Sequence, residues 1–130
     1  MKPEDKELLM IDFSSRLPWG VKVQHQHPDY LEEVQTVEYI SRKYGEIETN
    51  SVLGFVDDFK PYLRPLSSMT KEEKIEYRNI DNRSYSCPID YAHIPNSDRI
   101  DWLNAHHFDY RGLIEKGLAI AVTAENNPYK

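Results

Sequence analysis

The chain has 130 residues, 39% of them hydrophobic, and a formal net charge of −6 from 16 Lys and Arg against 22 Asp and Glu. This length and composition are typical of one folded domain that buries a core without disulfides. The acidic excess disfavours duplex nucleic acid, which needs a basic patch. The apolar runs are too short to cross a membrane, no signal-peptide pattern is present, and the single cysteine excludes an internal disulfide, so we expect a cytoplasmic protein.

An amphipathic helix is predicted over residues 3–16. Leu9, Phe13 and Leu17 recur every four residues and give this helix one apolar face. Pro18 ends the helix because it restricts the preceding residue to extended angles.

Four short strands are predicted next, over residues 21–25, 34–41, 46–49 and 52–56. Gly45 suits the turn between the second and third strands because it adopts positive φ without strain. Residues 60–66 are extended, but Pro61 and Pro65 lack the N–H that a central strand needs. We therefore expect this segment at an edge of the sheet or along the surface.

The second half of the chain is predicted to be mainly helical. Thr70 and Glu73 have the spacing of a capping box, and they begin a helix that runs to about residue 78. A long loop follows over residues 81–96. Two further helices are expected over 98–107 and 110–116, the last one capped by Asp109 and closed by Gly117, before a strand over 118–122 and a frayed tail.

Together these elements predict an α+β fold in one domain, residues 1–130. Its parts are an N-terminal helix (1–19), a β unit (20–66) and a helical unit with a short C-terminal strand (67–130). The β unit is expected to be a small antiparallel, SH3-like barrel or a bent sheet. Trp102 is expected to anchor the helical unit against this sheet.

Three segments carry a resemblance to a known family: RLPWGVKV at 16–23, KPYLRPLSSMT at 60–70 and DWLNAHHFDYRGLI at 101–114. In this order they resemble a family of uncharacterised small proteins from Bacteroides-type gut bacteria, their prophages and mobile elements. The resemblance implies a phage or mobile-element context and an intracellular location, and it carries no assigned activity or catalytic residue.

The histidines are the candidate metal ligands. His25 and His27 alternate on a predicted strand, so they point to the same side. His106 or His107 is the candidate third ligand, with Asp109 beside them. No HExxH or CxxC motif accompanies these residues, so we expect no metal site and no cofactor.

One thiol and one imidazole are close in the sequence, Cys87 and His93. Nucleophilic catalysis needs a thiolate held beside a base, and the base needs an orienting acid. No such acid is apparent near His93. The sequence therefore assigns no catalytic residue, and a small Cys/His or metal-dependent hydrolase is an alternative interpretation.

The nine tyrosines are the most unusual feature of the composition. Tyrosine is enriched at recognition surfaces, although most of these residues are expected at the rim of the core. The residues selected as partner-binding are Tyr39, Tyr44, Tyr62 and Arg64. The opposing interpretation is that Tyr62 packs onto the sheet and that Arg64 pairs with Asp57 or Asp58.

The favoured hypothesis is a non-enzymatic accessory protein of phage or mobile-element type that binds a host or phage protein. A single-stranded nucleic-acid binder that stacks bases on its tyrosines is the third hypothesis. It is disfavoured because acidic residues outnumber basic ones in the β region.

Overall fold

A computed structural model describes residues 1–30, 33–81 and 97–129. It has three α-helices, α1 (Pro3–Arg16), α2 (Lys71–Asp81) and α3 (Ser97–Ala105). Its strands are β1 (Lys22–His25), β2 (Val34–Ser41), β3 (Glu46–Thr49), β4 (Leu53–Phe55), β5 (Phe59–Pro65), β6 (Phe108–Asp109) and β7 (Ile120–Ala121). Short 3₁₀ turns lie at Leu17–Trp19, Pro28–Tyr30, Val56–Asp58 and Leu66–Ser68.

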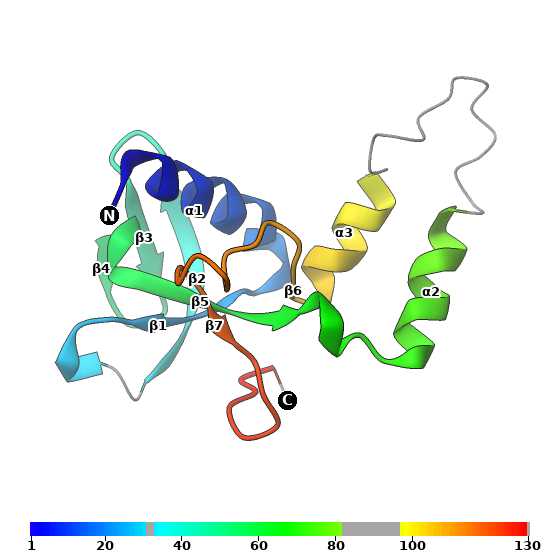
Figure 1. Cartoon of the computed structure of the whole chain (residues 1–130). Coiled ribbons are helices and arrows are strands. Elements are labelled where there is room, and N and C mark those ends of the chain that lie inside the picture. The colour runs from blue at the N-terminus through cyan, green and yellow to red at the C-terminus, as the bar shows by residue number, and fades with distance from the viewer. Residues whose placement is uncertain (31–32, 82–96, 130) are drawn as a thin grey trace.

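The strands form one mixed sheet in the order β4-β3-β2-β1-β5-β6, with β7 also paired to β5. The neighbours from β4 to β5 are antiparallel, whereas β6 and β7 run parallel to β5. The α+β class is therefore confirmed. Among the described residues no pairing joins β4 to β6 or β7, so the sheet is open and a closed barrel is not shown. Strands from both halves of the chain build this sheet (Figure 1).

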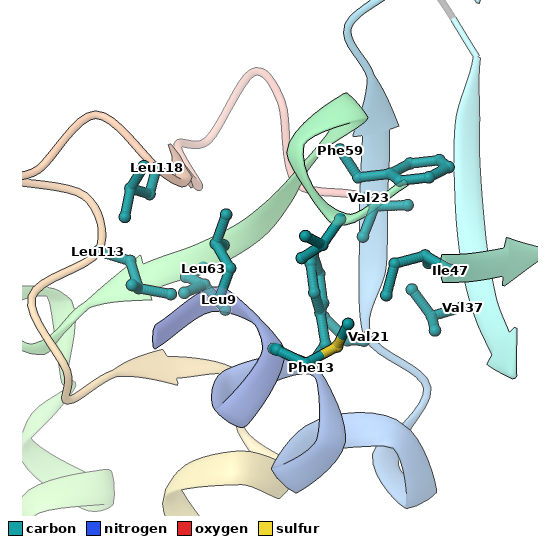
Figure 2. Packing of buried hydrophobic residues seen from close by; sticks show 12 residues of the cluster. Leu9, Phe13, Val21, Val23, Val37, Ile47, Phe59, Leu63, Leu113 and Leu118 are labelled. Atoms are coloured by element: carbon teal, nitrogen blue, oxygen red, sulfur yellow. The ribbon is translucent and has the colours of Figure 1, made fainter. Parts of the chain in front are cut away.

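Helix α1 covers the inner face of the sheet (Figure 1). Leu9 and Phe13 of this helix are fully buried, as are Val23 and Ile47 from the strands beneath them and Val21 just before β1. Figure 2 shows these side chains packed together in one cluster. Each fully buried side chain of this size contributes about 1.5–3 kcal/mol, so the predicted apolar stripe of the helix is what attaches it to the sheet.

The strands β2 and β3 have the bounds that alternation predicts. Gly45 has φ +66° in the turn between them, as expected. The pairing of β2 with β3 shifts register between Val37 and Tyr39, which marks a β-bulge that the sequence did not indicate. The predicted strand over 52–56 is confirmed in part, as β4.

The prediction that residues 60–66 lie at an edge or on the surface is wrong. They form β5, which pairs with β1 on one side and with β7 on the other. The carbonyl of Leu63 accepts from the Val122 N–H at 2.8 Å, so the backbone of Leu63 bonds toward β7. Because successive residues of a strand bond to alternate sides, the nitrogens of Pro61 and Pro65 lie on this same side. Both prolines are tolerated there because β7 pairs only with Tyr62 and Leu63 and takes no donor from either proline.

The predicted helix over 110–116 is also wrong, although Gly117 closes the segment as expected. The Asp109 carboxylate accepts from the N–H groups of Leu113 (3.0 Å) and Ile114 (2.9 Å), the fourth and fifth residues after it, whereas a helix cap bonds the second or third. Gly112 and Gly117 have φ +76° and +74°. Because Gly112 and Gly117 are both left-handed, only one helical turn forms between them, and this segment is a compact loop.

Helices α2 and α3 pack on each other beside the sheet (Figure 1). The Thr70–Glu73 capping box is confirmed, since each backbone N–H donates to the other side chain at 2.9 and 3.1 Å. Helix α3 stops at Ala105, before the predicted residue 107, because His107 has φ +63°. The predicted loop over 81–96 lies almost entirely outside the described residues.

Trp102 is only half-buried, whereas the sequence predicted that it anchors the helical unit against the sheet. Its ring lies 5.4 Å from Tyr77 of α2 and 5.7 Å from Phe108 of β6, and its indole N–H donates to Glu76 at 3.0 Å. Trp102 therefore joins α2 to α3. Leu103, one residue on, is a buried apolar side chain of this helix, and the polar Asn104 beside it is buried as well.

None of the helices in the described part of the chain combines the length and the apolar character that crossing a bilayer requires.

Candidate functional site

An exposed surface of apolar and acidic side chains lies on the strands β2, β3 and β4. Tyr39 is 58% exposed, Leu53 is 63% exposed and Phe55 is 57% exposed. The strand register sets Tyr39 opposite Glu48 and Glu48 opposite Leu53, in one row across the three strands. We call the following residues, of which the turn residue Tyr44 is 62% exposed, the outer face: Glu38, Tyr39, Tyr44, Glu46, Glu48, Leu53 and Phe55.

Strand alternation explains why these side chains point away from the core. Ile47 lies between the two glutamates of β3 and is fully buried. Gly54 lies between Leu53 and Phe55, and a Cβ on it would approach the ring of Phe59 to 3.0 Å, so this glycine faces inward. The neighbours of both residues must therefore face outward.

The β-bulge in β2 enlarges the outer face. Because two residues of β2 lie opposite Glu48, both Glu38 and Tyr39 are exposed. Bulges re-aim side chains without interrupting a sheet. The sequence signal for Tyr39 as a partner-binding residue was its residue type, and the bulge is the structural feature that exposes it.

The outer face is acidic. Within the described residues, Glu38, Glu46 and Glu48 take part in no ion pair. The nearest cations along the chain have other partners: the Arg42 guanidinium bonds Glu7 at 2.7 Å, and the Lys43 ammonium lies 5.3 Å from the Tyr44 ring centre.

The other two residues selected as partner-binding lie in the scaffold. Tyr62 is 7% exposed. The Arg64 guanidinium donates to both carboxylate oxygens of Glu73, at 2.7 and 2.8 Å, and lies 4.1 Å above the ring of Phe108. Arg64 thus pairs with a carboxylate of α2, and neither Asp57 nor Asp58 is its partner.

The histidines considered as metal ligands do not meet. His25 and His27 are close, with ring centres 6.2 Å apart, but the Nδ1 of each accepts a backbone N–H two residues on. His107 lies near Lys22, at the opposite end of β1, stacked on Tyr129. Across the described ranges no three His, Cys, Asp or Glu residues form a group that could hold a metal ion. Cys87 and His93 lie outside the described residues.

The C-terminal tail fills a gap between β1 and β5, contrary to the expectation that it frays. The Tyr129 hydroxyl donates to the Tyr62 carbonyl at 2.7 Å and accepts from the Lys22 N–H at 3.0 Å. The Tyr129 hydroxyl thus takes the place of a direct hydrogen bond from the Lys22 N–H of β1 to the Tyr62 carbonyl of β5. Burial raises the pKa of Tyr129, and burial together with the charge of Arg16 lowers the pKa of His107 to about 4.

A buried ion network joins α1 to the loop after β6. Asp12 and Arg16 are both fully buried and bond each other at 2.8 Å. Arg111 donates to the other oxygen of Asp12 at 2.7 Å, and Arg16 donates to the Phe108 carbonyl at 2.6 Å. The i,i+4 spacing of Asp12 and Arg16 is visible in the sequence, but it is typical of exposed helix faces. Nothing local indicates the contact with Arg111.

A shallow cleft of about 350 Å³ lies where the parallel strands β5 and β6 end. Asp109 is the more buried of the two acidic residues in its lining, and backbone N–H groups donate to both of its carboxylate oxygens. The cleft therefore presents no free base or nucleophile from this residue.

Comparison of the chain with protein-family models, with curated proteins and with solved structures finds no match.

Proposed function

We propose that this chain is a non-enzymatic accessory protein that binds another protein through the outer face. The observation that supports the proposal most is the exposure of four large side chains, Tyr39, Tyr44, Leu53 and Phe55, on one hairpin system. Contiguous exposed apolar side chains are a mark of interaction surfaces. Aromatic residues are also enriched at the centres of such surfaces.

The energetics agree with a binding role of moderate affinity. Burying a side chain of this size contributes about 1.5–3 kcal/mol. Four of them give about 6–12 kcal/mol, which is similar to the estimated cost of association. The apolar contacts therefore need further polar contacts before the complex is stable, and the glutamates of the outer face are placed to make them.

The resemblance to proteins of Bacteroides-type bacteria and their phages supports a host or phage protein as the partner, in the cytoplasm. The SH3-like barrel that the strand spacing predicts stays a prediction, and the proposal depends only on the antiparallel strands β2, β3 and β4.

Capture experiments with matched variants test the proposal. The purified chain, immobilised, is incubated with a lysate of the host, and captured proteins are identified by mass spectrometry. We expect a partner that the double variant Tyr39→Ser, Leu53→Ser no longer retains. Ile75→Ser is the control, because Ile75 is 50% exposed on α2, away from the outer face.

The variants must keep the melting temperature of the parent chain, which their exposed positions favour. A partner that is captured equally by all three proteins would move the interaction away from the outer face and contradict the proposal.

A further inference from the structure

We infer that the outer face binds an extended basic segment of its partner, with Lys or Arg at alternate positions. The inference rests on the proposed function and names the chemistry of the partner. It follows from the arrangement of charge and apolar surface across β2, β3 and β4.

The two glutamates of β3 form the middle of the surface. Glu46 and Glu48 are alternate residues of one strand, so their side chains leave the same face about 7 Å apart. Alternate side chains of an extended partner have the same spacing. Two basic residues separated by one position therefore meet the two carboxylates at once.

Apolar side chains flank this acidic column on both sides. Tyr39 of β2 and Leu53 of β4 lie opposite Glu48, and Phe55 lies opposite Glu46. The aliphatic stem of a lysine or arginine packs on such side chains while its charge reaches the carboxylate. Aromatic rings also attract cations directly, and the Lys43 ammonium already lies 5.3 Å from the Tyr44 ring centre.

The carboxylates are available to such a ligand. In the part of the chain that the structure describes, Glu38, Glu46 and Glu48 have no cationic partner. Glu46 and Glu48, alternate residues of one strand, therefore repel each other without compensation. A basic segment relieves this repulsion. A phosphate backbone or an acidic segment would add to it. A second copy of the chain, docked by the same face, would set glutamates against glutamates.

The partner is expected to cross the face and not to extend the sheet. Strand β4, which carries Leu53 and Phe55 of the outer face, is an edge strand of the sheet. Its Phe55 N–H already donates to the Asp58 carboxylate at 2.9 Å. This bond removes a donor that an added strand would need. Side-chain contacts are therefore left to provide the affinity.

Labelled synthetic peptides test the inference by fluorescence anisotropy. The probe is a nine-residue peptide that alternates lysine with valine. The comparison peptides have glutamate in place of lysine, or the same lysines in one contiguous block. We expect the alternating lysine peptide to bind most tightly, and we expect its affinity to fall as salt is raised.

The variant Glu46→Gln, Glu48→Gln should weaken binding of the alternating lysine peptide by about tenfold or more. The control Glu4→Gln, Glu72→Gln removes the same charge from exposed positions on α1 and α2, and it should leave the affinity unchanged. Equal binding of both lysine peptides, or equal effects of both double variants, would overturn the inference.

This failure is distinguishable from failure of the proposed function. If Tyr39→Ser, Leu53→Ser abolishes capture of a partner while Glu46→Gln, Glu48→Gln affects neither capture nor the peptide, the outer face is an interaction surface but its ligand is not a basic segment.

Discussion

The ring of His107 lies flat on the ring of Tyr129, with their centres 3.5 Å apart and their planes within 9°. His107 has the left-handed backbone conformation that joins α3 to β6, and Tyr129 belongs to the C-terminal tail. The stack positions the Tyr129 hydroxyl between the Lys22 N–H and the Tyr62 carbonyl. Tyr129 therefore links β1 to β5 at Lys22 and Tyr62, where these two strands are not paired directly.

Tyr129→Phe should destabilise the protein by about 1–3 kcal/mol, because it leaves the part-buried Lys22 N–H and Tyr62 carbonyl without their shared partner. The phenyl ring keeps the stack on His107, so the loss measures the hydroxyl alone. Urea unfolding followed by tryptophan fluorescence gives the free energy. Tyr44→Phe removes an exposed hydroxyl and should change it by less than about 0.5 kcal/mol.

The Tyr129 hydroxyl also makes the free energy of unfolding depend on pH in the alkaline range. Burial raises the pKa of Tyr129 above the unfolded value of 10.0, so above pH 10 the folded state binds more protons than the unfolded state. Stability should therefore fall as the pH rises through this value. Tyr129→Phe should flatten the fall without removing it, because burial also raises the pKa of Tyr62. An unchanged alkaline slope in this variant would contradict the assignment.

His107 should make the protein less stable in mild acid. Burial, and then the charge of Arg16, lowers its pKa from 6.5 to about 4. Between these values the unfolded state takes up a proton that the folded state does not, so stability falls as the pH drops from 6.5 towards 4. Glu73 acts in a lower window, because its hydrogen bond with Arg64 lowers its pKa from 4.5 to about 2.

His107→Asn isolates this effect, since asparagine tolerates the left-handed conformation. The variant loses the stack and is less stable at neutral pH, so the slope of unfolding free energy against pH is compared between pH 6.5 and 4.5. We expect a flatter slope than in the parent chain. The parent slope in His107→Asn would mean that another group titrates in this window.

Tyr62→Ala and Arg64→Ala separate scaffold from recognition. Tyr62 is almost fully buried, and its truncation should cost about 3 kcal/mol. Arg64→Ala removes two charge-assisted hydrogen bonds to Glu73 and should cost about 1.5–3 kcal/mol. Partner capture should fall only with the folded fraction. Complete loss of capture with an unchanged melting temperature would return these residues to the binding site.

Local patterns predicted the parts of the fold that depend on neighbours in the sequence. The alternation of apolar and polar residues predicted β2 and β3, and the four-residue spacing of Leu9 and Phe13 predicted α1. The place of β5 depends on which edge of the strand each proline nitrogen faces, and this is set by the pairing partners. The loop after Asp109 depends on the positive φ of Gly112, which residue type permits but does not require.

Residue type alone did not separate the exposed candidate residues from the buried ones. Residue type selected Tyr39, Tyr44, Tyr62 and Arg64 together, and the structure leaves the first two exposed and places the other two in the scaffold. Exposure depends on what covers a strand face. The Tyr62 side chain is 7% exposed and its carbonyl bonds Tyr129, 67 residues away, whereas nothing in the described part of the chain covers the outer face. Leu53 and Phe55 were missed because apolar strand residues are more often core.

The buried network of Asp12, Arg16 and Arg111 carries the last prediction. Asp12 is the one carboxylate that both guanidinium groups share, at 2.8 and 2.7 Å, and it is fully buried with Arg16. Asp12→Ala leaves a buried cation uncompensated and should cost about 3–5 kcal/mol. Urea unfolding at neutral pH measures the loss.

The double variant Asp12→Leu, Arg16→Met decides whether the cost comes from the unpaired charge. It replaces both buried charges with apolar side chains, and such replacements are often neutral or stabilising. The Arg16 Nη1 atom, which has no hydrogen-bond partner among the described residues, makes the replacement easier. We expect the double variant to be more stable than Asp12→Ala. A double variant as unstable as the sum of Asp12→Leu and Arg16→Met singly would instead show that the two side chains act independently, with packing and not charge pairing as their contribution.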